Sequence, residues 1–501
     1  MKHKDSRIKY NIVSSLIYQV VLIGLSFLLP RLYLENFGSA VNGVLSTIKQ
    51  IFMYLFLLEA GVGLATTQAL YKRIGENDQA GASRVLSATH IYYRKTGIVY
   101  LCIILLLAVV YAYVVPTGMN SHVVFWIVIL TALPALFSYF VQAKYRILME
   151  VDGRKYVINN SDIVVQLVAN LGKVLVLVFT DSLILIQLVY CAISMTQLAY
   201  LYAYAKRRYK WLDLNAEPDV AAISQKNSVL VHQLSGMVFN NTDVILLSVL
   251  CDFKVVSVYT IYHIFFSQIQ NFIANLISGL QFAMGQMFHA DRQRFDKIYE
   301  MYESLYIMGT FIIYTLMAVF LLPLIQIYTS GITDTNYTNV TLVFLFVLMN
   351  LLSNGKIPVN NVLEYAGRFS DTRSQAIWEM VINIVTSVVA IYFWGICGAI
   401  LGTIAALVYR SIVMIDYSNR KILGRSVMKT YKCWLVNGAV FGVVMIIFFV
   451  DSFSGVSFGR LLLNGILHSI WIVALYLVVN FLFQRNSFQT LFELLGRKQR
   501  V

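Results

Sequence analysis

Charged residues are scarce in this sequence. They make up 13% of the 501 residues, whereas a soluble domain carries about 25%. Hydrophobic residues make up 58%, and the mean hydropathy is +0.69. This composition excludes an ordinary soluble protein. It predicts an all-α polytopic membrane protein, in which each span is a run of about 20 apolar residues.

Metal-binding and disulfide patterns are absent as well. A disulfide framework is read from regularly spaced cysteines in a short secreted chain, and a metal site from paired cysteines and histidines. We therefore expect neither a metal nor a disulfide framework. The five cysteines lie in or beside apolar runs without such spacing: Cys102, Cys191, Cys251, Cys397 and Cys433.

Enzymatic motifs are also missing. The sequence contains no Walker phosphate-binding loop, and no nucleophile with a nearby base stands out. The connections expected on the outer side, such as 330–338, are too short to hold a glycan acceptor. We predict that the protein is not an enzyme and that it needs no cofactor.

Apolar runs long enough to span a membrane occur fourteen times, and no cleavable signal peptide is evident before the first. The runs are 11–34, 42–70, 96–115, 122–142, 158–180, 183–204, 228–250, 256–284, 305–328, 339–363, 377–394, 397–415, 433–450 and 461–483.

Lysine and arginine test this count independently, because cytoplasmic loops are enriched in them. With the N-terminus inside, 31 of the 39 fall in cytoplasmic segments and three, Arg31, Lys254 and Arg460, fall on the outer side. A shift by one run would invert this bias. We therefore predict that both termini are cytoplasmic, and we attribute the net charge of +14 to membrane orientation rather than to nucleic-acid binding. The other five cations lie within or at the edge of runs: Lys49, Lys173, Lys356, Arg410 and Lys432.

A faint repeat of about 216 residues relates the two halves of the chain, since Asn11 and Asn227 open corresponding runs and Gly63 falls opposite Gly279. Runs 1–6 and 7–12 have the same orientation, as in transporters built from parallel repeats. We predict an N-terminal six-helix lobe at 1–210 and a C-terminal six-helix lobe at 211–425. Residues 426–501 would form two additional transmembrane helices and a cytoplasmic tail.

The second run contains a carboxylate. Leu57 to Lys72 reads LLEAGVGLATTQALYK, and Glu59 lies where a charge costs roughly 2.5–3.5 kcal/mol to insert. Small residues follow it at helical spacing, which lets another helix approach closely. An ionisable residue at this depth indicates a working group facing a bundle interior or a wet cavity.

This stretch resembles the second helix of bacterial polysaccharide flippases, the Wzx-type transporters of the multidrug/oligosaccharidyl-lipid/polysaccharide exporter superfamily. Residues 240–262, NNTDVILLSVLCDFKVVSVYTIY, resemble the signature of the same family across helices 7 and 8. The resemblance implies two six-helix lobes that enclose a central cavity, with the last two helices appended.

The resemblance also implies a function. A flippase of this kind moves a polyprenyl-diphosphate-linked oligosaccharide from the cytoplasmic to the outer leaflet of the bacterial inner membrane, by alternating access, for capsule, O-antigen or a related envelope glycan. The expected partners are this lipid-linked oligosaccharide, membrane lipids, and the glycan polymerase and glycosyltransferases of the same pathway.

Four basic residues are candidate substrate ligands. Lys49, Lys173 and Lys356 lie within runs, and Arg31 follows Pro30 near the outer end of the first run. If they face a cavity, they would suit a diphosphate, whose charge needs compensation when it leaves the headgroup region. The alternative is that each pairs with a neighbouring carboxylate and specifies how the helices pack.

Four polar residues are candidates for coupling or for a polar cavity wall. Glu59 and Asp243 would exchange a proton or a cation, and Asn240 and Asn241 would hydrogen-bond a sugar or hold a water. The alternative is that they hold helices together. Without an ATP site, energy would come from an ion gradient, the membrane potential or consumption of the flipped product.

Three other functions stay open. A multidrug or cation antiporter of the same superfamily is expected to have twelve helices and a carboxylate-rich site. A peptidoglycan-precursor flippase shares the fourteen helices and a cationic cavity, so only a substrate assay distinguishes it from a polysaccharide flippase. A membrane enzyme acting on lipid-linked glycans would keep its activity on a soluble substrate analogue in detergent.

The distribution of basic residues gives a topology prediction. We expect a reporter fused after Val501 to be cytoplasmic and a reporter inserted at Gly331 to be exported, because the flanking loops differ in their content of lysine and arginine. A paired enzymatic reporter assay in cells measures both. Finding the two reporters on the same side of the membrane would overturn the count of fourteen runs.

Overall fold

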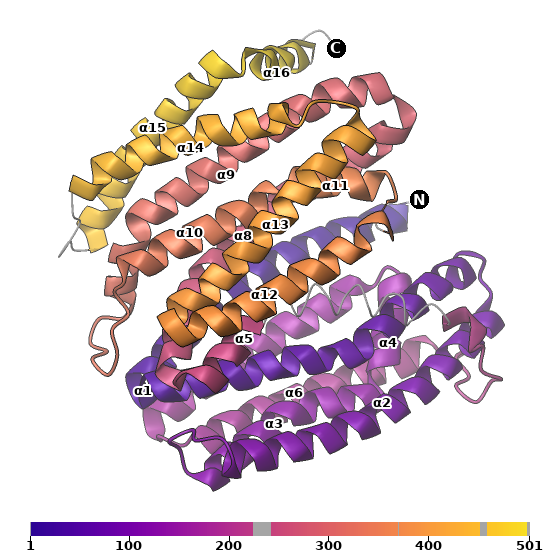
Figure 1. Ribbon diagram of the computed structural model, residues 1–501. Coiled ribbons are helices and arrows are strands. Elements are labelled where there is room, and N and C mark those ends of the chain that lie inside the picture. Colours follow the sequence, from indigo (N-terminus) through magenta and orange to yellow (C-terminus); the bar gives the residue numbers. More distant parts are fainter. Residues whose placement is uncertain (1, 224–241, 369, 451–457, 498–501) are drawn as a thin grey trace. The chain divides into compact units, whose positions relative to one another are not determined.

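The computed structural model describes residues 2–223, 242–368, 370–450 and 458–497 (Figure 1). Within these ranges the chain forms helices and no β-strand, which confirms the prediction of an all-α polytopic membrane protein. In the same ranges, ten helices are long and apolar enough to cross a membrane. Helices are expected here because lipid offers the backbone no hydrogen-bond partner.

Contacts divide the chain into two compact units. The first comprises 1–248 and 252–257, and the second comprises 249–251 and 258–501. The lobe boundaries at 210 and 425 that the sequence suggests stay a prediction.

The first unit is a bundle of long helices, coloured indigo to magenta in Figure 1. In this bundle α3 packs against α2 and α6, and α1 packs against α2 and α5. The described helices are α1 (Lys2–Gly75), α2 (Gln79–Tyr113), α3 (Ser121–Val141), α4 (Ala143–Val151), α5 (Lys155–Phe179), α6 (Leu183–Arg208) and the short η1 (Ala221–Ile223), and residues 242–250 are also helical.

Helix α1 contains the first two predicted spans. Gly38 separates them, because its φ of 79° and ψ of 179° interrupt the helical conformation. This region of backbone space is open essentially to glycine alone. The chain therefore turns at Gly38 without the short loop that the apolar pattern suggested at 35–41.

Buried aromatic residues fill much of the core of the first unit. Tyr93, Tyr100 and Tyr139 join α2 to α3, and the rings of Tyr100 and Tyr139 meet edge to face with their centres 5.1 Å apart. Such a geometry is favourable for aromatic pairs beyond the area that they bury. A second cluster around Val44 and Ile127 joins α1 to α3.

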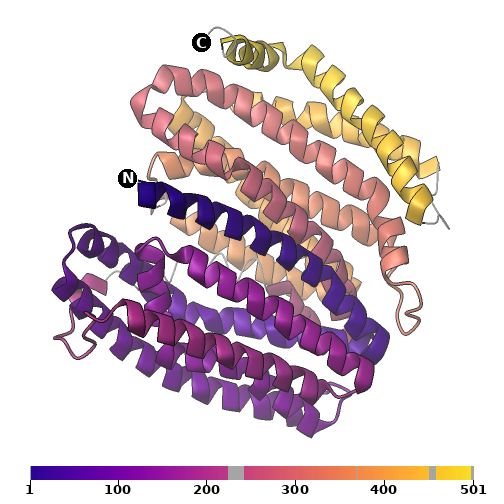
Figure 2. The same cartoon turned by 180° about the vertical axis from the view of Figure 1, so that it is seen from behind.

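The second unit is organised around α9, and Figure 2 shows it from the other side. Helix α9 packs against α10, α14, α15 and α16, while α13 packs against α10 and α12. Its described helices are α8 (Phe253–Ala290), whose first residues belong to the first unit, α9 (Arg292–Tyr328), α10 (Val340–Gly355), α11 (Ile357–Tyr365), η2 (Ser370–Thr372), α12 (Arg373–Trp394), α13 (Ile396–Tyr417), η3 (Ser418–Leu423), α14 (Met428–Val450), α15 (Phe458–Phe483) and α16 (Arg485–Arg497).

Several helices continue beyond the predicted spans. Helix α2 begins at Gln79, inside the expected loop 71–95, and α9 begins at Arg292, inside the expected loop 285–304. Asp78 caps α2 by accepting a hydrogen bond from the Gly81 N–H at 2.7 Å, and this bond lowers the pKa of Asp78. Apolar patterning marks the part of a helix that lies in lipid, so it misses the polar turns that extend beyond it.

Helices α12 and α13 approach each other closely at two glycines. A Cβ atom built on Gly398 would lie 2.1 Å from the Ala390 carbonyl oxygen, and one on Gly402 would lie 2.5 Å from the Ser387 Cα. Both contacts are with backbone, so side-chain rotation cannot relieve them. Small residues four positions apart are the usual means of close helix packing in membranes.

We expect Gly398→Ala and Gly402→Ala to lower the melting temperature of the detergent-purified protein, because overpacking costs about 1–3 kcal/mol. Gly438→Ala and Gly442→Ala on α14 are matched controls with the same spacing, since a Cβ there meets no atom within 4 Å. If all four variants melt alike, the contact between α12 and α13 is not as close as the structure has it.

Candidate functional site

Lys49 and Lys173 lie on neighbouring helices of the first unit, α1 and α5. The side chain of Lys49 is exposed, and that of Lys173 is half-buried with its Nζ 4.4 Å from the centre of the Tyr190 ring. The two ammonium groups are close enough to repel each other. No carboxylate among the side chains that the structure describes pairs with either lysine. The structure thus brings together two predicted site residues that no described carboxylate compensates.

Lys356 lies at a break between two helices of the second unit. Helix α10 ends at Gly355, and α11 begins at Ile357 with Pro358 in its first turn. Proline is tolerated there because the first turn of a helix has no intrahelical partner for its N–H. The break falls inside one candidate membrane span, Val340–Tyr365. Interrupted helices at membrane depth are a feature of transporter binding sites.

A three-residue cluster surrounds this break. Lys356 Nζ lies 2.8 Å from Glu379 Oε1, and Arg410 Nε lies 3.4 Å from Glu379 Oε2. Arg410 also donates to the Thr372 carbonyl oxygen at 3.3 Å. The three charged side chains are only 11–13% exposed. One carboxylate therefore faces two cations, and the cluster keeps a net positive charge.

Arg31 has a local partner. Its Nη2 lies 2.6 Å from Glu35 Oε1, one helical turn further along α1, and the side chains are 23% and 43% exposed. A partly exposed pair of this kind contributes at most about 1 kcal/mol. It nevertheless offsets the charge of Arg31.

One of the polar candidates of the first unit, Asp243, lies near α1. Asp243 is buried beside Thr242, whose hydroxyl lies 2.8 Å from the hydroxyl of Tyr54 on α1. Asp243 also interacts electrostatically with Tyr54. Glu59 belongs to α1 as well, but its side chain lies outside the described part of the structure. The other two polar candidates, Asn240 and Asn241, lie outside the described residues.

One buried carboxylate was missed by sequence reasoning, which left Glu303 in a loop. Glu303 is 1% exposed, accepts from Arg425 through one oxygen and accepts from Thr430 Oγ1 at 2.7 Å through the other. Burial lowers the pKa of Arg425, but the charge of Glu303 outweighs this effect and raises the pKa above its ordinary value. Tyr299 and Tyr306 at helical spacing around Glu303 were the signal for a buried helix face.

Lys144 is a second buried residue that the predicted runs place in a loop, where a lysine is ordinarily exposed. It is 4% exposed, and its Nζ donates to the Phe140 carbonyl oxygen at 3.1 Å and lies 5.1 Å from the centre of the Tyr145 ring. Burial lowers the pKa of Lys144 to about 8. A cation that binds the last carbonyls of a helix stabilises its C-terminus. Lys144 therefore has a structural role at the end of α3.

Comparisons by sequence find no match, either to a family model or to a curated protein. Solved structures of membrane transporters share its fold. A structure of the lipid II flippase MurJ in an inward closed conformation aligns with a TM-score of 0.69 at 12% identity, over 95% of this chain and 99% of that chain.

Two MATE transporters share the fold over a smaller part of this chain. An inward-facing MATE family transporter of the MOP superfamily aligns with a TM-score of 0.60 at 14% identity, over 84% of this chain and 99% of that one. The MATE transporter VcmN of Vibrio cholerae gives 0.52 at 15% identity, over 85% of this chain and 99% of that one. The chain thus has the fold of polytopic helical transporters.

The Glu379 cluster predicts an asymmetry between variants. Lys356→Met leaves Glu379 paired with Arg410, whereas Glu379→Gln leaves two cations buried in apolar spans, and breaking a buried pair costs about 3–5 kcal/mol. We expect Glu379→Gln to reduce membrane abundance and melting temperature more than Lys356→Met does. The double variant, with one cation left, should recover part of the loss. Equal damage from both single variants would contradict this charge balance.

Proposed function

We propose that the protein is a flippase that moves a polyprenyl-diphosphate-linked oligosaccharide from the cytoplasmic to the outer leaflet of the bacterial inner membrane, for synthesis of an envelope polysaccharide of the capsule or O-antigen type. Both termini would be cytoplasmic. Alternating access would carry the diphosphate and the sugars through a polar interior while the lipid tail stays in the bilayer.

The pair Lys49 and Lys173 carries this proposal. Each cation is costly at membrane depth, and the two repel each other across the contact between α1 and α5. A bound anion offsets both charges at once, and a diphosphate presents several oxygens that accept from two ammonium groups. A cationic drug would be repelled, so the pair argues against a multidrug or cation antiporter.

The fold comparison supports a lipid-linked substrate. The alignment with the lipid II flippase covers 95% of this chain, against 84% for the inward-facing multidrug transporter, and its TM-score is higher. The same observation favours a peptidoglycan-precursor lipid flippase as the second candidate. We place the oligosaccharide substrate first because of the motifs at 57–72 and 240–262.

The remaining candidates are proposed as further substrate contacts, each within its own unit. Lys356 can exchange Glu379 for a phosphate oxygen because Arg410 continues to offset the carboxylate. Arg31 would contact the phosphate groups of the substrate near the outer end of the first span. Asp243 would line the polar interior together with Asn240 and Asn241, which would hydrogen-bond the sugars.

We expect Lys49→Met and Lys173→Met to abolish surface export of the glycan while membrane abundance stays normal, because methionine keeps the length of the side chain and removes its charge. Lys173→Arg should retain part of the export. Lys155→Met is a matched control, since Lys155 forms an exposed pair with Glu150 at 2.5 Å. Loss of folded protein in place of lost export would make the two lysines structural.

A competition assay separates the two leading substrates. In proteoliposomes, unlabelled lipid-linked oligosaccharide should reduce translocation of a labelled copy, and lipid II should compete poorly. Strong competition by lipid II, with little by the oligosaccharide lipid, would favour the peptidoglycan-precursor flippase.

Glu59 is the proposed coupling residue, because burial without a permanent partner would let a carboxylate bind and release a proton. We expect Glu59→Gln, which cannot titrate, to abolish translocation driven by an imposed pH gradient in proteoliposomes, and Glu59→Asp to keep part of it. If the Gln variant transports normally and responds to the gradient unchanged, Glu59 is a packing residue and not a coupling residue.

A further inference from the structure

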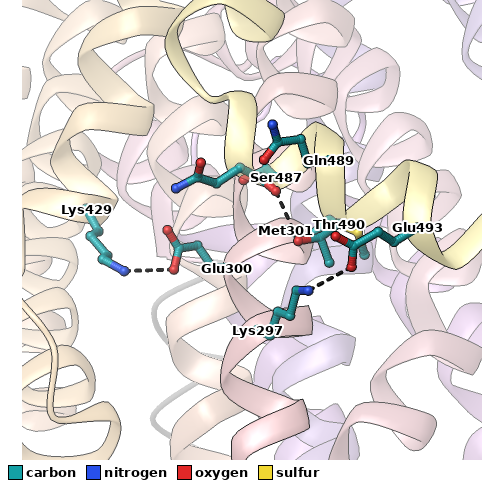
Figure 3. A pocket seen from close by; sticks show the side chains of 9 residues that line it. Lys297, Glu300, Met301, Lys429, Ser487, Gln489, Thr490 and Glu493 are labelled. Carbon is teal, nitrogen blue, oxygen red and sulfur yellow. Dashed lines mark hydrogen bonds and ion pairs between the residues drawn. The ribbon is translucent and has the colours of Figure 1, made fainter.

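A polar pocket of about 330 Å³ lies at one end of α9 in the second unit, between α9, α14 and α16 (Figure 3). Two ion pairs border it. Lys429 Nζ lies 2.7 Å from Glu300 Oε2, and Lys297 Nζ lies 2.8 Å from Glu493 Oε2. The pocket therefore presents two cations and two carboxylates, and none of these four residues is among the proposed substrate contacts.

These ion pairs are easy to exchange. The four side chains are 39–58% exposed, so water already competes for them. Exposed pairs of this kind contribute little to stability. A ligand with one positive and one negative group can replace both partners and leave every charge compensated. A ligand that carries only negative charge leaves the two carboxylates without a partner. A ligand that carries only positive charge leaves the two lysines without one.

The pocket lies where a membrane span ends. The candidate span Gly465–Phe483 finishes one turn before the first residues of α16 that line the pocket. The last three side chains of α15 are exposed and apolar, and Phe492 on α16 is 58% exposed. The pocket therefore lies just beyond the apolar stretch that crosses the membrane. The pocket thus combines a position at the end of a span with three exposed apolar residues, Phe481, Leu482 and Phe483, in the preceding turn of the chain.

We propose that this pocket binds the headgroup of a phospholipid that carries both a phosphate and a primary ammonium, the phosphoethanolamine class. Lys297 and Lys429 donate to the phosphate oxygens, and the ammonium donates to Glu300 and Glu493. Ser487 and Thr490 also line the pocket, and Thr490 Oγ1 donates to the Asn486 carbonyl oxygen at 3.0 Å. A quaternary ammonium has no proton to donate to the carboxylates, and an anionic glycerol headgroup brings no cation to them.

The test compares three lipids with identical acyl chains on the full-length, detergent-purified protein. Phosphatidylethanolamine should raise the melting temperature in a saturable way, and phosphatidylcholine and phosphatidylglycerol should not, because a ligand that binds only the folded state stabilises it. Equal shifts with all three lipids, or a shift with phosphatidylglycerol alone, overturn the proposal.

Variants locate the effect. Lys297→Gln with Lys429→Gln should abolish the shift that phosphatidylethanolamine causes, while Lys155→Gln, which removes an exposed pair elsewhere, should keep it. If the double variant does not survive purification, Glu493→Gln alone should weaken the shift, since it removes one acceptor for the ammonium. An unchanged shift in the pocket variants shows that the lipid binds elsewhere and overturns the proposal.

Discussion

Polar groups at membrane depth have to be satisfied by the protein itself, and this constraint shapes the chain from backbone to ion pairs. Lipid offers the backbone no hydrogen-bond partner, so the spans are helices. Irregular backbone appears where protein surrounds it or where glycine tolerates it, as at Gly38 and at the break before Pro358. Buried charges follow the same rule, because an unpaired ion in an apolar span is costly.

The two units meet this constraint differently. In the second unit Glu379 and Glu303 are buried, and each is held by one or two cations from other segments. In the described part of the first unit, Lys49 and Lys173 have each other and the Tyr190 ring in place of a carboxylate. The second unit therefore gives its buried carboxylates cationic partners, with one positive charge in excess at Glu379, while the two lysines of the first unit have no partner among the described carboxylates.

The sequence predicts the spans well because one physical signal, an apolar run, defines them. The helical class of the fold follows directly from it. Pairing is harder to predict: Lys356 and Glu379 are separated by 23 residues, and Glu303 and Arg425 by 122. Whether such residues meet depends on the rotation of each helix about its axis and on which helices become neighbours. Composition and hydropathy determine neither the rotation of a helix nor its neighbours.

The same limit applies to the candidate site. The sequence identifies Lys49 and Lys173 as costly cations, but their proximity depends on the packing of α1 against α5. Under the proposed function this proximity links binding to motion. The empty protein bears the repulsion between the two ammonium groups, and an anionic substrate relieves it in whichever conformation holds the lysines closest. A ligand shifts a conformational equilibrium only by its difference in affinity for the two states. A pair of like charges supplies such a difference in affinity when its spacing differs between the two conformational states.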